Sequence, residues 1–377
     1  MTTDDQLPDP QKAIVVLSDC HLSAGRFYNG RLNPHEDFVF DHEMCDLIDF
    51  FSSDKYGDGT EVDLILAGDY LDYLNIPIEG EFTDAITEAI ALEKTEIIFS
   101  GHKEVMGALR RFAAKPGKRL IYLIGNHDAE LFFPSVQEKI VRRWDPNGEF
   151  PSASVKVIAD EDRIFYEEGV EVRHGNQFEP SNTLEMNDPF EQSYRGDKLL
   201  KLPWGSIYVL KIINRLKWDR PYVDKIRPVK LFVMVGLFID PLFTIKFSFL
   251  SGYYFLRARV LSGKLFKIRF NDLLEFIKQE TKFFQDLEGS AKELLDNSPR
   301  THTVIFGHTH RPMHKIYPSG KQYLNTGTWT RMIQLDFQGM GNVFRRTFAL
   351  VHIKDGKTHS ELRQWEGNQS PHKAFYD

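Results

Sequence analysis

The chain alternates between short runs of apolar residues and longer stretches in which apolar residues recur every three or four positions. The apolar runs predict buried β-strands at 12–21, 64–72, 119–128, 169–176 and 303–306, with shorter strands at 155–158 and 163–167. The longer stretches predict helices at 37–53, 83–114, 134–144, 207–218 and 271–295. Three runs near the end, within 322–329, 331–337 and 345–353, predict closing strands. Strands that alternate with helices in this way are typical of an α/β fold.

Length and composition narrow the class of protein. With 377 residues, 42% hydrophobic and 27% charged, the chain is longer than most single domains, so we expect a main domain over 1–190 and 271–377 interrupted by an insertion at 191–270. Two cysteines, Cys20 and Cys45, cannot form a disulfide framework, which favours a reducing compartment. The start, MTTDDQLPDP, lacks the pattern of a signal peptide, and we expect a cytoplasmic protein.

Polar residues able to bind metal follow each of the five main strands. They are Asp19 and His21; Asp69 and Asp72 after Gly68; Asn126, His127 and Asp128 after Gly125; His174 before Gly175; and His308 and His310 after Gly307. Alternation along the first strand would place Asp19 and His21 on one side and Cys20 in the core. Ligand sites in open α/β sheets lie beyond the carboxyl ends of the strands. Each group alone is common, but together they predict one centre of mixed nitrogen and oxygen ligands, which suits first-row divalent metals.

In this order, the five groups resemble the motifs of the calcineurin-like metallophosphoesterases. The resemblance covers about 12–190 and 271–355. It implies a four-layer αββα sandwich that hydrolyses phosphoester or pyrophosphate bonds with two divalent metal ions, most often Mn²⁺, with Fe or Zn also used. It also implies that the first ion is held by Asp19, His21, Asp69 and His310, and the second by Asp69, Asn126, His174 and His308. His127 would then act on the leaving group, with Asp72 holding its ring.

Two details of the motifs bear on the substrate. Protein phosphatases of this family follow the second motif with Arg-Gly, whereas this chain has Tyr73 and Leu74, which argues against a phosphoprotein substrate. The segment GHTHRP at 307–312 is similar to the branch that contains UDP-2,3-diacylglucosamine diphosphatases, whose substrate is lipid-linked. We expect Arg311 and Asn126 to contact the substrate.

The insertion is both basic and apolar. Residues 195–269 contain 16 Lys or Arg against four Asp and no Glu. Charged residues and Pro241 cut the apolar run 229–260 into stretches of about ten residues, too short to span a bilayer. We expect 204–262 to lie on an anionic membrane surface, at the inner face of the plasma membrane, with Leu231, Phe232, Phe238, Phe243, Phe247 and Phe249 below the headgroups.

The sequence leaves open other roles for the insertion and other functions for the whole chain. The insertion is also consistent with a helical cap that buries its own core, or with a dimer interface. Its aliphatic and Phe content argues against nucleic acid as the partner of its positive charge. Besides a lipid-linked phosphoester, the alternatives are a soluble phosphodiesterase or nucleotidase with a closing cap, and a non-catalytic scaffold such as the retromer subunit that resembles these enzymes.

Overall fold

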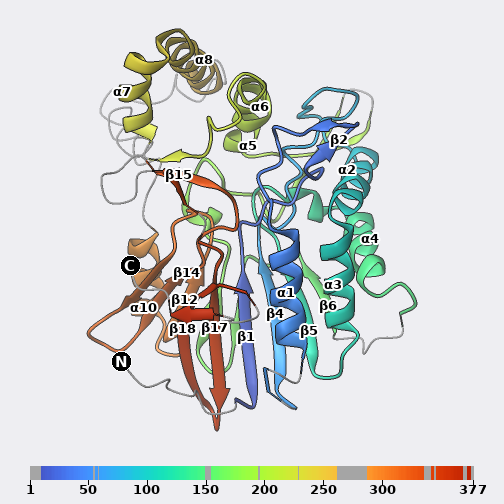
Figure 1. Ribbon diagram of the computed structural model, residues 1–377, viewed down its shortest axis with the longest axis vertical. Helices are drawn as coiled ribbons and strands as arrows, with labels where there is room; N and C mark the ends of the chain where they lie inside the picture. Colours follow the sequence, from blue (N-terminus) through green and yellow to red (C-terminus); the bar gives the residue numbers. More distant parts are fainter. Residues whose placement is uncertain are drawn as a thin grey trace.

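The computed structural model describes most of the chain. The described residues are 10–53, 56–57, 59–148, 154–193, 196–227, 229–260, 287–334, 341–343, 345–367 and 372–374. Two β-sheets form the centre of the molecule and helices lie outside them (Figure 1).

The larger sheet carries the first three ligand-bearing strands. Its order is β19 (His372–Ala374), β18 (Lys357–Trp365), β17 (Thr347–Lys354), β1 (Lys12–Leu17), β4 (Glu61–Ala67), β5 (Lys118–Leu123) and β6 (Val155–Ile158). The strands β1, β4, β5 and β6 are parallel, whereas β17 pairs with β1 in the antiparallel sense. Because β1, β4 and β5 are neighbours and run the same way, their carboxyl ends lie at one edge.

The smaller sheet carries the other two ligand-bearing strands. Its order is β13 (Met313–Ile316), β14 (Gln322–Asn325), β12 (Thr303–Phe306), β8 (Val170–Val172) and β7 (Ile164–Tyr166), with β12 parallel to both β14 and β8. The two sheets pack face to face through a buried layer that includes Val16 and Ile65 on one side and Val172 and Ile305 on the other. Burial of this layer on folding is the main force that holds the sheets together.

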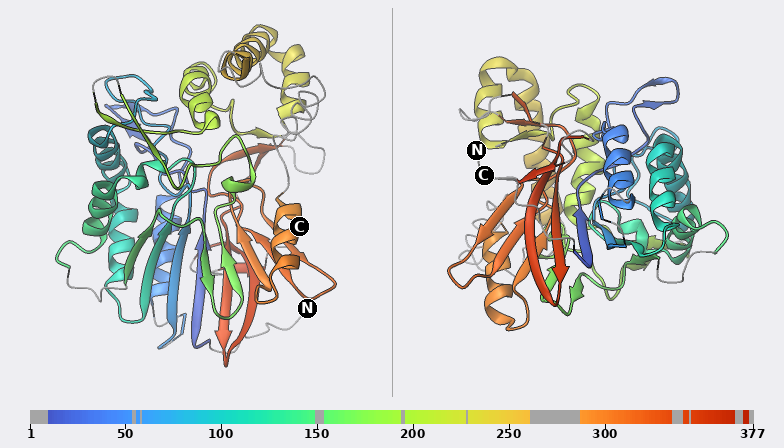
Figure 2. Two further views of the ribbon diagram at one scale, coloured as in Figure 1. Left: turned by 180° about the vertical axis from the view of Figure 1, so that it is seen from behind. Right: turned by 60° about the horizontal axis from the view of Figure 1, so that its bottom comes forward.

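Helices cover the outer faces of both sheets (Figure 2). α1 (Asp41–Ser52), α2 (Glu88–Gly101), α3 (Lys103–Ala113) and α4 (Pro134–Trp144) lie on the larger sheet, where Phe51, Phe112 and Trp144 are buried. α10 (Glu288–Asn297) lies on the smaller sheet and buries Leu295 against Val304. The four-layer αββα architecture expected from the sequence is therefore confirmed.

The single helix expected over 83–114 is wrong: the structure has α2 and α3, with a break at His102. The His102 ring is buried between two acids, with Nδ1 2.6 Å from Asp41 Oδ1 and Nε2 3.3 Å from Glu36 Oε2. These contacts tie the chain to α1 and the loop before it, which overrides the apolar periodicity. Of the helix expected over 271–295, α10 accounts for the end, and 271–286 lie outside the described residues.

The described part of the insertion contains two helical units. α5 (Trp204–Tyr208), the π-helical turn η3 (Val209–Ile213) and α6 (Asn214–Lys217) form one continuous rod, and α7 (Val229–Ile239) and α8 (Pro241–Val260) form a hairpin. Between them, β11 (Ile226–Arg227) pairs with β15 (Met332–Gln334), which in turn pairs with β16 (Gly341–Val343). The expected boundaries of the insertion, at 190 and 270, stay a prediction, and residue 270 is outside the described residues.

One expectation about the insertion is wrong. Phe243 and Phe247 are only 7% exposed, because they pack on Leu216 and Val223 in a small core of the insertion itself, so they do not dip into lipid. The side chains of Leu231 and Phe232 are outside the described part. Among the described helices, none has both the length and the apolar character needed to cross a bilayer.

The remaining elements are short and mostly lie in loops. They are β2 (Phe27–Tyr28), β3 (Arg31–Leu32), η1 (Ala129–Phe132), η2 (Asn176–Phe178), β9 (Phe190–Gln192) and β10 (Lys198–Leu200). The 3₁₀ turns η1 and η2 begin shortly after the polar residues that follow β5 and β8. In both places the polar side chains come before the turn, at the end of the strand.

Candidate metal centre and active site

The strand-end residues predicted from the sequence meet in space. Three clusters of potential ligand atoms form there: Asp19, His21 and His310; Asp69, His174 and His308; and His21, Asp72 and His127. They come from the ends of β1, β4, β5, β8 and β12. Asn126 joins the second cluster, because its Oδ1 lies 3.2 Å from His174 Nε2.

The backbone at these strand ends is strained. Of the nine non-glycine residues with positive φ in the described chain, five are Asp19, His21, Asp69, His308 and His310, with φ between 50° and 68°. This left-handed conformation is unfavourable for residues with a Cβ and clusters at functional sites. The expectation that strand alternation aims Asp19 and His21 is wrong, since β1 ends at Leu17 and the left-handed turns set their directions. Cys20 is buried in the core as expected.

Glycines make room for the ligand side chains. A Cβ on Gly307 would collide with the Asp19 carboxylate and Ser18, and a Cβ on Gly125 would collide with the Asp69 carboxylate. Any larger residue at either position would displace a candidate ligand, which explains the glycine in both motifs.

The Asp19 carboxylate has one oxygen engaged and one left over. Oδ2 accepts hydrogen bonds from the hydroxyl of Ser18 and from the backbone N–H of His308. Oδ1 is buried without a hydrogen-bond partner and lies 3.2 Å from His310 Nε2. A buried acceptor that is left unsatisfied is costly in free energy. A cation at this position would satisfy it.

The rings of His21 and His310 face each other through their Nε2 atoms, which are 3.0 Å apart. The Nδ1 atom of His21 lies 3.1 Å from Asp72 Oδ2, a carboxylate that can only accept, so Nδ1 carries the ring proton. In the neutral ring, the Nε2 lone pair of His21 would point toward His310 and Asp19, as expected of a metal ligand.

His174 is held in the same tautomer. Its Nδ1 lies 2.9 Å from the carbonyl oxygen of Ala67, and its Nε2 lies 3.2 Å from both Asp69 Oδ2 and Asn126 Oδ1. In the neutral ring, Nε2 would present a lone pair to two oxygens, an arrangement that a cation or a second ring proton stabilises. Burial lowers the pKa of His174, but the Asp69 carboxylate outweighs it and raises this pKa to about 9. The donor set therefore fits divalent first-row metals.

Asp72 serves two histidines at once. Besides His21, it faces His127, whose Nδ1 is 3.2 Å from Asp72 Oδ1 at ion-pair distance without the geometry of a hydrogen bond. Burial disfavours ionisation of Asp72, but the charge of His127 outweighs burial and holds the pKa of Asp72 well below its usual range. Burial likewise lowers the pKa of His127, and Asp72 and Asp69 outweigh it, raising this pKa to about 10.

Glu179 is a site residue that the sequence did not indicate. Its Oε2 lies 2.5 Å from Nε2 of His308, and it also accepts a hydrogen bond of 2.9 Å from Asn182 Nδ2. This contact fixes the proton on Nε2 and leaves Nδ1 of His308 for a metal. Glu179 follows His174 by five residues without a glycine or a strand end beside it, so no local pattern marks it.

The insertion also reaches the centre. Ser206 of α5 donates a hydrogen bond of 3.3 Å to the backbone oxygen of Asn126, and Asn214 of α6 donates one of 2.8 Å to Leu74. At the end of α6, Lys217 is fully buried between Asp37 and Asp224, 2.8 Å from each. The rod α5–α6 therefore packs against the main domain next to Asn126.

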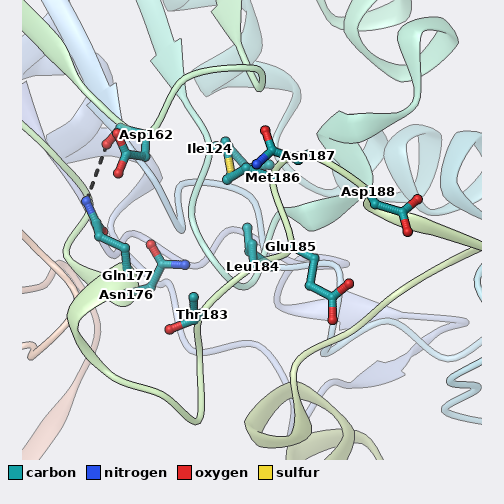
Figure 3. A pocket seen from close by; sticks show the side chains of 10 residues that line it. All are labelled: Ile124, Asp162, Asn176, Gln177, Thr183, Leu184, Glu185, Met186, Asn187 and Asp188. Atoms are coloured by element: carbon teal, nitrogen blue, oxygen red, sulfur yellow. Dashed lines mark hydrogen bonds between the residues drawn. The ribbon is translucent and has the colours of Figure 1, made fainter.

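Two further features lie beside the metal ligands. Arg311 is exposed next to His310, and within the described residues its side chain forms no hydrogen bond or ion pair. A cavity of about 500 Å³ lies beyond Asn126 and His174, and none of the candidate ligands lines it. Figure 3 shows polar side chains around an apolar floor of Ile124, Leu184 and Met186: Asp162, Asn176, Gln177, Thr183, Glu185, Asn187 and Asp188.

Comparison with known proteins is consistent with this chemistry. Residues 12–314 match the family model for calcineurin-like phosphoesterases. A search of curated proteins found no match. Among solved structures, a predicted phosphoesterase from Streptococcus pneumoniae is 12% identical, covers 96% of both chains and has a TM-score of 0.29.

Two other similar structures are Vps29 proteins. The one from Cryptosporidium parvum is 12% identical, covering 97% of this chain and 98% of its own, with a TM-score of 0.27. The Zn²⁺ complex from Entamoeba histolytica is 22% identical over 23% of this chain and 42% of its own, with a TM-score of 0.16. Since TM-scores below 0.5 do not establish a shared fold, the family assignment rests on the sequence match alone.

Proposed function

The chain belongs to the calcineurin-like phosphoesterases, a family of metal-dependent hydrolases, and on that premise we propose that it cleaves a phosphodiester or pyrophosphate bond in an amphipathic substrate. The observation that carries the proposal is the meeting of seven candidate ligand side chains at five strand ends, where His21 Nε2 faces His310 and the free Asp19 Oδ1, and His174 Nε2 faces Asp69 and Asn126.

We assign these side chains to two ions. Asp19, His21 and His310 would hold one, Asn126, His174 and His308 the other, and Asp69 would be shared. When bound, two divalent ions supply an activated water and positive charge for the phosphoryl group. Mn²⁺ is the proposed metal, since nitrogen and oxygen ligands in this mixture suit it, as they also suit Fe and Zn.

His127 is the proposed acid for the leaving oxygen. Asp72 faces its Nδ1 and fixes the orientation of the ring, which leaves Nε2 for the substrate. The ring is about one-fifth exposed, whereas His21 and His174 are buried, so His127 can reach a bound molecule. General acid catalysis from this position would contribute about 10²–10⁴-fold to the rate.

Three features around the centre support an amphipathic substrate. The polar cavity beyond Asn126 offers amide, hydroxyl and carboxylate groups that suit a sugar or nucleoside, while Arg311 offers an exposed guanidinium for phosphate. The apolar helices of the insertion stand on the rod that contacts Asn126. A nucleotide sugar that carries acyl chains, such as UDP-diacylglucosamine, combines these three kinds of group.

A hydrolysis screen tests the substrate. A lipid-linked nucleotide-sugar pyrophosphate in micelles, a cyclic nucleotide and an aryl phosphodiester are compared with Mn²⁺ and with a chelator, using Asp69→Asn as the inactive control. We expect the highest kcat/KM for the lipid-linked pyrophosphate, and we expect Asn187→Ala to raise KM for it but not for the aryl compound. Preference for the cyclic nucleotide would instead identify a soluble phosphodiesterase whose cap closes over its substrate.

A further inference from the structure

The hairpin α7–α8 presents an exposed apolar face. The exposed side chains are Met234, Leu237, Phe238, Ile239, Leu242, Ile245, Phe249 and Tyr253. Phe238 is 90% and Leu242 83% exposed. On α8 the exposed positions 242, 245, 249 and 253 recur every three or four residues, so they share one side of the helix.

The opposite side of α8 is also apolar, and it is already covered. Phe243 and Phe247 pack there on Leu216 and Val223. A helix on the surface of a protein in water normally turns polar residues outward. An apolar face of this size, left open while the other side is packed, marks a contact surface.

Among the described side chains, two cations beside the face are paired within the insertion. Lys246 pairs with Asp219 at 2.8 Å, and Arg220 pairs with Asp240 at 2.7 Å. The exposed stripe therefore offers few of the directional polar contacts that give a protein interface its specificity. The apolar side chains of this face suit the interior of a lipid layer, where directional polar contacts are not needed.

The border of the face has exposed aromatic side chains. Trp218, 63% exposed, precedes Asp219 and Arg220, which pair with Lys246 of α8 and with Asp240 at the turn between α7 and α8. Tyr253 is exposed at the other end of the stripe. Trp and Tyr favour the headgroup region of a bilayer, and exposed Arg215 is free to meet anionic headgroups.

From these observations we propose that the α7–α8 face lies in the headgroup region of a lipid bilayer, with Phe238, Ile239 and Leu242 at the hairpin tip among the acyl chains. The inference rests on the proposed function, to which it adds how the enzyme reaches its substrate. Figure 1 shows the hairpin beyond the ends of the sheets, on the side of the molecule where α5 and α6 lie. Because that rod contacts Asn126, docking of the hairpin would hold the metal centre beside lipid-borne phosphoesters.

Sedimentation with vesicles of equal parts phosphatidylcholine and phosphatidylglycerol tests the proposal. The wild-type chain is compared with the triple variant Phe238→Ser, Leu242→Ser and Phe249→Ser. The matched control is Phe27→Ser with Leu32→Ser, which removes exposed apolar side chains from the distant β2–β3 hairpin. We expect the triple variant to bind about tenfold or more weakly and the control to bind like wild type. Moderate salt should weaken wild-type binding without abolishing it, because apolar contacts are not screened.

Hydrolysis of a soluble aryl phosphodiester is measured in parallel, and it should be unchanged in the triple variant. If neither the wild type nor the variants hydrolysed the aryl phosphodiester, the proposed function would be contradicted. If the wild type hydrolysed it but did not bind vesicles, only the membrane inference would be contradicted. Equal binding of the triple variant and wild type would also overturn it. So would a wild-type dimer in sedimentation equilibrium that the triple variant dissociates, since a second copy would then cover the face.

Discussion

Glu179 Oε2 lies 2.5 Å from Nε2 of His308, although 129 positions separate the two residues in the chain. The contact orients His308 and selects the tautomer that leaves Nδ1 for the metal. Carboxylates in this outer position typically contribute 10–100-fold to metal affinity or activity.

Glu179→Gln should therefore weaken Mn²⁺ binding by about 10–100-fold, with activity restored at saturating Mn²⁺. An activity titration with Mn²⁺ gives both quantities. Glu185→Gln, on the same loop but paired with Lys201, is the matched control and should bind Mn²⁺ like wild type. A kcat that stays low at saturating metal would mean that Glu179 acts on the substrate instead.

His127 and Asp72 should separate by their effects on metal. His127→Ala should lower kcat by about 10²–10⁴-fold while the metal content is unchanged, because His127 is placed to act on the leaving group. Asp72→Asn should lower both kcat and metal content, since Asp72 also holds His21. Elemental analysis of the two purified variants checks the difference, and metal loss in His127→Ala would contradict the role assigned to it.

The buried ion pairs of Lys217 should make the insertion essential to the fold. Burial opposes the charge of Lys217, but Asp224 and Asp37 outweigh it and raise its pKa. Lys217→Met would remove one cation from buried Asp37, which keeps Lys225, and from half-buried Asp224, and should destabilise the protein by about 3 kcal/mol.

Lys211→Met is the control for that measurement. Lys211 forms a partly exposed pair with Asp84, so its loss should cost less than about 1 kcal/mol. Urea unfolding of both variants measures the two values. Equal, small effects would show that the insertion is not integral to the stability of the whole chain.

His102 should make stability depend on pH. Burial lowers the pKa of His102, but the contacts with Asp41 and Glu36 outweigh it and raise this pKa to about 9. Because the folded pKa exceeds the unfolded value near 6.5, the stabilisation is fully present below about pH 6.5 and is lost as pH rises through about 9. The loss is about 3 kcal/mol.

Urea unfolding from pH 6 to pH 9.5, on metal-loaded protein, measures this loss. His102→Asn should be less stable at low pH and should lack this part of the pH dependence. Parallel stability curves for wild type and His102→Asn would contradict the raised pKa.

The sequence indicates which polar side chains lie together where the evidence is local. Asp19, Asp69, Asn126, His174 and His310 each stand at the end of an apolar strand, and parallel strands bring such ends together. Glu179 and Ser206 could not be found this way, because their roles depend on contacts with His308 and Asn126 that are distant in the chain.

The sequence also does not show which apolar residues of the insertion are buried. Phe247 and Phe249 have the same chemistry and are two positions apart, yet one packs in the core of the insertion and the other is 71% exposed. Only the packing of α8 on α6 distinguishes them. The break at His102 has a similar cause, since the apolar periodicity continues through it and two acids from elsewhere in the chain decide the geometry.

Titration of metal-free protein with Mn²⁺, followed by bound metal and aryl phosphodiester hydrolysis in the same samples, tests the central claim most directly. We predict two bound ions per chain, activity that appears as the sites fill, and loss of both in Asp69→Asn, which removes the shared carboxylate. Hydrolysis that persists in the metal-free protein, or a wild-type chain that binds no Mn²⁺, would contradict it.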